Sequence, residues 1–165
     1  MGRRQVGRAG GHPGCAPGAC LSPQTGAVTY DLERFSSAQE GVYAGVLEDL
    51  RRGRKTGHWI WFIFPQIGGL GSSWISQQYS IVSLDEARAY LADPVLGERL
   101  RVCATLVLAT KDRTAAEIFG SLDAMKVRSC MTLFLRAAPD EPLFQQVLDR
   151  YYGGVPDELT DARLG

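Results

Sequence analysis

Helix start signals recur along the second half of the chain, and they constrain the fold more than any other feature of the sequence. A small hydroxyl residue followed three positions later by glutamate is the pattern of a capping box, and aspartate followed by proline also favours a helix start. The chain carries these patterns at Ser83/Glu86, Asp93/Pro94 and Thr114/Glu117. Each precedes an apolar run, so the sequence predicts consecutive helices joined by short links.

Apolar residues between these signals recur at steps of three and four, which is the spacing of a buried helix face. The clearest stripe belongs to a long helix that is expected to begin at Ser121 or Asp123 and to end at Pro139. Its members are Val127, Cys130, Met131, Phe134 and Ala138. One long central helix is therefore expected in this half of the chain.

The other expected helices are shorter or less regular. Asp31 can cap the first, which should run past Leu50 and end at Gly53 in a left-handed conformation. The rest are expected over residues 57–64, 83–92, 93–107, 114–119 and 140–152. The aromatic segment at 59–64 has strand-like composition, but no second segment could pair with it. The sequence thus predicts an all-α fold, a compact multihelical single domain over residues 30–165 with five to seven unequal helices.

Residues 1–29 have a different composition, with many glycines and prolines and little to bury, so we expect a disordered tail. His12, Cys15 and Cys20 lie in it, but their spacing matches no standard zinc site and a fourth ligand is missing. An unstructured tail is favoured over a metal site, and no cofactor is predicted. Cys103 and Cys130 are expected to be reduced core thiols.

The charge balance restricts the partners of the protein. Lys+Arg and Asp+Glu both number 18, whereas a general nucleic-acid binder would carry a basic excess. The longest apolar run, Trp59–Phe64, is far shorter than the roughly 20 residues of a membrane helix. The N-terminus also lacks the apolar stretch of a secretory signal. We expect a cytoplasmic protein that binds neither nucleic acid nor membrane.

The segment HWIWFIFPQIGGLGSS, residues 58–73, is the first candidate for a binding site. A helix over its aromatic half would be apolar on most sides, which favours a position in the core. Alternatively, Trp61 could stack on a flat ligand group and Gln66 could bind a ligand amide or base edge.

The second half of this segment is a glycine-rich turn. Gly71 allows close backbone approach, and Ser72 and Ser73 can cap a helix that starts near Trp74. Such a turn directs free N–H groups at one point and can bind an anion. An ordinary turn is the alternative, because the pattern is neither a Walker motif nor a dinucleotide fingerprint.

Two further candidates complete the site hypothesis. Lys126 and Ser129 lie beside the apolar stripe of the long helix, where they either face a phosphate or carboxylate or form a solvated edge. His58 is the one histidine of the expected domain and is therefore the candidate catalytic acid or base. A hydrogen-bonded structural histidine is the alternative.

Six segments, taken in order, resemble the bacterial family known as domain of unknown function 1810. They cover about residues 30 to 160 and read YDLERFSSAQ, HWIWFIFPQ, GLGSS, SLDEARAYLADPVLGERL, IFGSLDAMKVRSCMTLF and FQQVLDRYYGG. The chain departs from the family pattern in its additional N-terminal 29 residues and at Cys130, where the family has serine. The resemblance implies a compact all-helical domain and no established activity.

We hypothesise that residues 58–73 and the long helix form a pocket for a small anionic, nucleotide-like metabolite. The ligand-binding residues would be Trp61, Gln66, Gly71, Ser72, Ser73, Lys126 and Ser129. One alternative is a non-enzymatic protein-interaction module. Another is an ADP-ribose- or NAD-related hydrolase, suggested by a distant likeness of Met125, Met131 and Phe134 to helical ADP-ribose-processing proteins. Whether the protein is an enzyme stays open.

Overall fold

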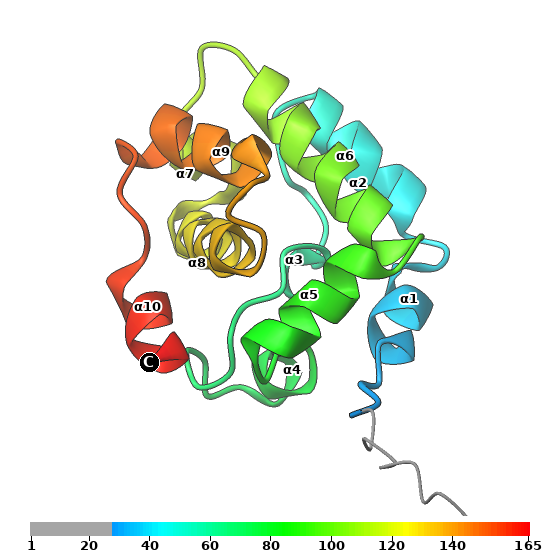
Figure 1. Cartoon of the computed structure of the whole chain (residues 1–165). Coiled ribbons are helices and arrows are strands. Elements are labelled where there is room, and N and C mark those ends of the chain that lie inside the picture. Colours follow the sequence, from blue (N-terminus) through cyan, green and yellow to red (C-terminus); the bar gives the residue numbers. More distant parts are fainter. Residues whose placement is uncertain (1–27) are drawn as a thin grey trace, which may run out of the picture.

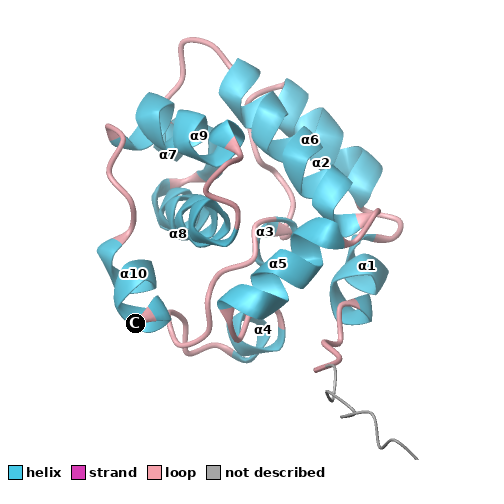
Figure 2. Cartoon of the chain, in the orientation of Figure 1, coloured by secondary structure: helices cyan, strands magenta, loops and turns pink. Residues whose placement is uncertain are grey.

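The computed structural model describes residues 28–165, and these form ten helices joined by short loops (Figures 1 and 2). The helices are α1 (Glu33–Gln39), α2 (Tyr43–Arg51), α3 (Ile60–Ile63), α4 (Trp74–Gln78), α5 (Leu84–Ala92), α6 (Leu96–Ala109), α7 (Ala115–Phe119), α8 (Ser121–Ala137), α9 (Pro142–Tyr152) and α10 (Glu158–Leu164). The described part of the chain contains no regular strand, only a single parallel bridge between Ile67 and Ile81. The predicted all-α fold is confirmed.

Helix α8 is the centre of the structure, and α5, α7, α9 and α10 pack around it (Figure 1). The predicted stripe is buried: Val127, Cys130, Met131 and Phe134 are all nearly inaccessible. Phe134 contacts the rings of Tyr90 on α5 and Phe144 on α9. Burial of these large side chains on three helices contributes hydrophobic stabilisation to the fold.

The predicted helix starts are made by the expected side chains, with one difference. Thr114 and Glu117 form a complete capping box. Ser83 caps α5 by accepting the Glu86 N–H, but Glu86 does not return the bond to Ser83. Its carboxylate instead accepts the Val82 N–H and pairs with Arg34 of α1.

The prediction of one continuous first helix from Asp31 to Leu50 is wrong. The chain turns at Gly41, which has φ +74°, and this left-handed residue separates α1 from α2. Asp31 makes no cap, since α1 begins one residue after Leu32. This break and the short helices α4 and α10 account for a helix count above the predicted five to seven.

The segment predicted to be helical from Gly57 to Phe64 is helical only over Ile60–Ile63. The N–H groups of Thr56 and Gly57 donate to the carboxylate of Asp49 on α2. This tertiary contact holds the chain in a turn before Trp59, so the helix starts later than its sequence suggests. Gly53, with φ +63°, ends α2 close to where the sequence predicted.

Some sequence predictions concern residues outside the described part of the chain, and others concern metal sites or membrane helices. The predicted disordered tail falls mostly on residues 1–27, and His12, Cys15 and Cys20 also lie outside the described part. Cys103 and Cys130 are buried free thiols. Between residues 28 and 165, no three metal-ligating side chains form a cluster, and no helix has the length and apolar character needed to span a bilayer.

Candidate functional site

A cavity of about 490 Å³ lies between α8, the loop that precedes α4 and the segment that leads into α10. Its lining comprises Trp61, Gln66, Leu70, Gly71, Ser72, Ser73, Ser76, Leu122, Met125, Lys126, Ser129, Asp157 and Leu159. The structure therefore brings all seven ligand-binding candidates from the sequence to one hollow. That they bind a ligand stays a prediction.

The glycine-rich loop owes its shape to close contacts with its neighbours. A Cβ on Gly71 would lie 2.6 Å from the Ser76 hydroxyl oxygen, so a larger residue here would force Ser76 to move. Upstream, the Gly68 N–H and the Gln66 carbonyl bond the backbone of Ile81 at 2.8 Å each. These contacts fix the polar wall of the cavity.

The start of α4 is less suited to binding an anion than the sequence predicts. Ser73 does cap α4, because its Oγ accepts the Ser76 N–H at 3.2 Å. That bond occupies an N–H that an anion would need, and α4 has only five residues. The Ser72 hydroxyl and the Gln66 amide make no hydrogen bond with any other described residue, so both are available to a ligand.

Lys126, the one cation of the cavity lining, belongs to a lysine pair that shares one carboxylate. Lys126 Nζ lies 2.7 Å from Asp123 Oδ1, and Lys55 Nζ lies 2.8 Å from Asp123 Oδ2. Partial burial would raise the pKa of Asp123, but the hydrogen bonds from Lys126 and Lys55 hold it below its ordinary value. These three groups carry a net charge of +1, which the Asp157 carboxylate in the cavity lining opposes.

Lys126 also lies over the indole of Trp61, with its Nζ 4.7 Å from the ring centroid. Such a cation–π contact orients both side chains. A flat ligand group that stacks on Trp61 would have to share the ring with the ammonium or move it. The sequence could not reveal this contact, because the two residues belong to separate helices.

Asp157, which the sequence analysis missed, faces the same cavity from the start of α10. Its Oδ2 accepts hydrogen bonds from the Ser129 hydroxyl at 3.0 Å, the Thr160 N–H at 3.0 Å and the Thr160 hydroxyl at 2.6 Å. Ser129 is thus a partner of Asp157 and only 5% exposed. The available signal was an acidic residue after Pro156 at a helix start, a pattern of a helix cap.

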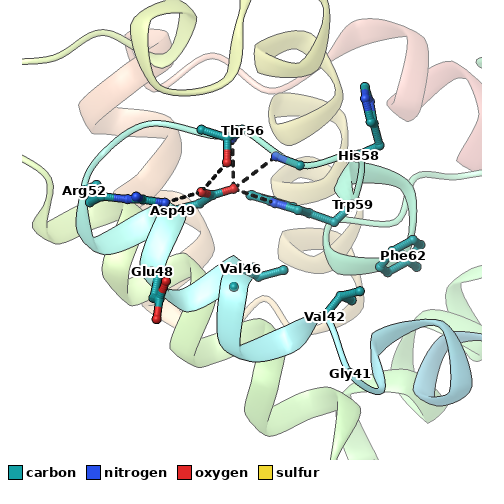
Figure 3. Close-up of a pocket in the computed structure, with 12 residues that line it drawn as sticks. Gly41, Val42, Val46, Glu48, Asp49, Arg52, Thr56, His58, Trp59 and Phe62 are labelled. Atoms are coloured by element: carbon teal, nitrogen blue, oxygen red, sulfur yellow. Dashed lines mark hydrogen bonds and ion pairs between the residues drawn. The ribbon is translucent and has the colours of Figure 1, made fainter.

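His58 does not belong to this cavity. It is exposed and lines a second hollow of about 350 Å³ beside α2, together with Val42, Val46 and Phe62 (Figure 3). The structure therefore separates the candidate acid or base from the seven predicted ligand-binding residues. An enzymatic use of His58 would need a different site from the one that the sequence hypothesis described.

Asp49 is the best-connected side chain of the second hollow (Figure 3). Its buried carboxylate accepts five hydrogen bonds, from the Thr56 N–H and hydroxyl, the Gly57 N–H, the Trp59 indole and Arg52. Burial alone would raise the pKa of Asp49, but these bonds lower it far below its ordinary value. This fully paired carboxylate ties α2 to the segment before α3. It has little remaining capacity to accept hydrogen bonds from a ligand.

The three tryptophans occupy three different environments. Trp59 is buried and donates its indole N–H to Asp49. Trp61 is half-buried in the cavity wall, and Trp74 is 75% exposed. Burial in the core accounts for Trp59, whereas Trp61 lies in the wall of the candidate ligand cavity.

Comparison with known proteins identifies the family. A family model described as "Protein of unknown function (DUF1810)" matches residues 29–164. The chain belongs to the DUF1810 family. The resemblance seen in the sequence is thereby confirmed over nearly the whole described region.

A solved structure supports the fold of this DUF1810 protein. The chain is similar to the conserved hypothetical protein Rv1873 from Mycobacterium tuberculosis, with 50% sequence identity and a TM-score of 0.81. The match covers 82% of this chain and 96% of the other. No functionally curated protein matches the chain. The comparisons thus establish family and fold, and they assign no activity.

Proposed function

We propose that the cavity between α8 and the glycine-rich loop binds a small anionic metabolite of nucleotide-like chemistry. The observation that supports this most strongly is the convergence of Lys126, Trp61 and the glycine-rich loop on one hollow of about 490 Å³. Pockets of this size hold small ligands, with a mainly apolar lining and a few polar groups that fix orientation.

The charge of the ligand follows from the lysine pair. Lys55 and Lys126 share Asp123, and their side chains are only 9% and 26% exposed. Partial burial reduces screening by solvent, so the Lys126 ammonium attracts an anion more strongly than a surface lysine does. Phosphate or carboxylate oxygens are natural acceptors for the Lys126 ammonium.

The rest of the ligand follows from the apolar and amide groups of the lining. Trp61, Leu70 and Met125 present apolar surface, and the Gln66 amide has both donors and an acceptor free. A flat heteroaromatic ring with polar edges matches this combination. The proposal includes a cytoplasmic location, where such metabolites are abundant.

A protein-interaction role is the second candidate, and exposed apolar side chains favour it. Leu122, Met125 and Leu159 are 63–76% exposed at the cavity. Exposed apolar groups at a hollow with a few polar groups suit a ligand with an apolar part as well as a partner protein. The hydrolase alternative has less support, since the cavity lining contains no histidine or cysteine and its one carboxylate is Asp157.

Isothermal titration calorimetry and thermal unfolding with AMP, ADP-ribose, adenosine and inorganic phosphate test the proposal. We expect AMP or ADP-ribose to bind more tightly than adenosine, because only the former offer a phosphate to Lys126. A ligand at a hundredfold excess over its Kd stabilises the folded state by about 2.7 kcal/mol, which raises Tm measurably. If none of the four compounds releases heat or shifts Tm, the proposal is wrong.

A further inference from the structure

We infer that Asp157 selects, among anionic ligands, those that also carry neighbouring hydroxyl groups, such as the vicinal diol of a ribose. This inference rests on the proposed function and names the substrate class of that site more narrowly. The cavity would then recognise a ribonucleotide or sugar phosphate and discriminate against a simple anion.

The two oxygens of the Asp157 carboxylate have different surroundings. Oδ2 accepts three hydrogen bonds, from Ser129 and from both donors of Thr160. Oδ1 has no hydrogen-bond partner among the described residues, although Asp157 lines the cavity. A carboxylate has about four lone-pair sites, so this side chain keeps acceptor capacity for a ligand.

The carboxylate is held in place independently of any ligand. The backbone N–H of Asp157 donates to the Thr132 hydroxyl at 2.8 Å, and Arg128 binds the carbonyls of Val155 and Pro156 just before it. Thr132 is fully buried. A preorganised acceptor costs little entropy on binding, which is the property of a group that confers specificity.

Lys126 and Asp157 together set the chemistry of a ligand that fills the space between them. Lys126 precedes Ser129 by three residues on α8, so their side chains are neighbours on one helix face. Ser129 in turn contacts Asp157. A donor of positive charge and an acceptor of hydrogen bonds therefore lie within the length of one compact ligand.

A bare anion would satisfy Lys126 but meet the negative charge of Asp157 without compensation. A phosphate joined to a sugar satisfies both, because its hydroxyl groups donate to the carboxylate while its phosphate accepts from the ammonium. Carboxylates bind ribose hydroxyls in this way in other nucleotide sites. Capping of α10 alone would not require aspartate, since asparagine or serine caps equally well.

The test compares AMP with 2′,3′-dideoxy-AMP by calorimetry on the full-length protein. Loss of the hydroxyl groups is expected to weaken binding to the wild-type protein about tenfold, the effect of a hydrogen bond to a charged group. Asp157→Asn, which keeps a cap oxygen, should reduce this preference to less than about threefold while AMP still binds. The control Asp140→Asn alters an exposed carboxylate outside the cavity and should leave the preference unchanged.

The outcomes separate the inference from the proposed function. If neither nucleotide binds the wild-type protein, the proposed function and the inference both fail. If AMP and its dideoxy analogue bind equally, the inference alone is overturned and the anion site stands. The wild-type comparison decides this without any variant, so a poorly folded Asp157→Asn protein would not obscure the result.

Discussion

Replacement of Asp49 by alanine is expected to lower the free energy of unfolding by about 3 kcal/mol. The carboxylate is 3% exposed and accepts five hydrogen bonds from Arg52, Thr56, Gly57 and Trp59. Its removal leaves the buried indole N–H of Trp59 and the partly buried N–H groups of Thr56 and Gly57 without their acceptor. An unpaired buried group costs roughly 1–3 kcal/mol. Urea unfolding followed by circular dichroism measures the change.

Glu48→Ala is the matched control, because Glu48 is the exposed neighbour on the same helix and makes no such contacts. We expect it to change stability by less than about 0.5 kcal/mol. Equal effects of the two substitutions would contradict the assignment of Asp49 as the tie between α2 and the segment before α3.

The Asp49 carboxylate also makes the free energy of unfolding depend on pH. The pKa of Asp49 is lowered in the folded protein, so its contribution is fully present above its unfolded value near pH 4. The contribution falls as the pH drops from there toward the folded pKa. In Asp49→Ala, the loss of stability below pH 4 should accordingly be smaller than in the wild-type protein.

Lys126→Met is expected to weaken AMP binding about 10- to 100-fold in calorimetry. Methionine keeps most of the side-chain length but removes the ammonium, and charged hydrogen bonds contribute roughly 1.5–3 kcal/mol. The loss also leaves Asp123 paired with Lys55 alone and removes the one ammonium group of the cavity lining, where the Asp157 carboxylate remains.

Lys111→Met provides the control for general charge effects. Lys111 is exposed in the loop after α6 and lies outside the cavity lining. Its replacement removes the same charge from the protein. The Kd of AMP should nevertheless change less than twofold, because salt screens an exposed charge outside the cavity. Similar losses of affinity in both variants would show that Lys126 attracts the ligand only through the overall charge.

Much of the fold could be predicted because its signals are local. The capping box at Thr114 and the stripe through Phe134 depend only on residues one turn apart, and both are as expected. The failures have tertiary causes. Asp49 takes the N–H groups of Thr56 and Gly57, and this shortens α3 in a way that the apolar pattern does not reveal.

The candidate site could likewise be predicted only in part. Residues chosen for their chemistry, such as Lys126 and Ser72, do line one cavity. The partners of these residues cannot be predicted from the sequence. Lys55 pairs with Asp123, and Asp157 accepts from Ser129, only because distant segments pack together. His58 is close to Trp61 in sequence, yet the turn before α3 places it at the other hollow.

The indole N–H signals of the three tryptophans, observed by ¹⁵N NMR during titration with AMP, test the central claim most directly. Trp61 lines the proposed site, Trp59 is buried against Asp49 and Trp74 is exposed, so the protein carries its own controls. We predict a saturable shift of the Trp61 signal while the Trp59 signal stays in place. A saturable shift of Trp59 or Trp74 with Trp61 unmoved would contradict the claim that this cavity is the binding site.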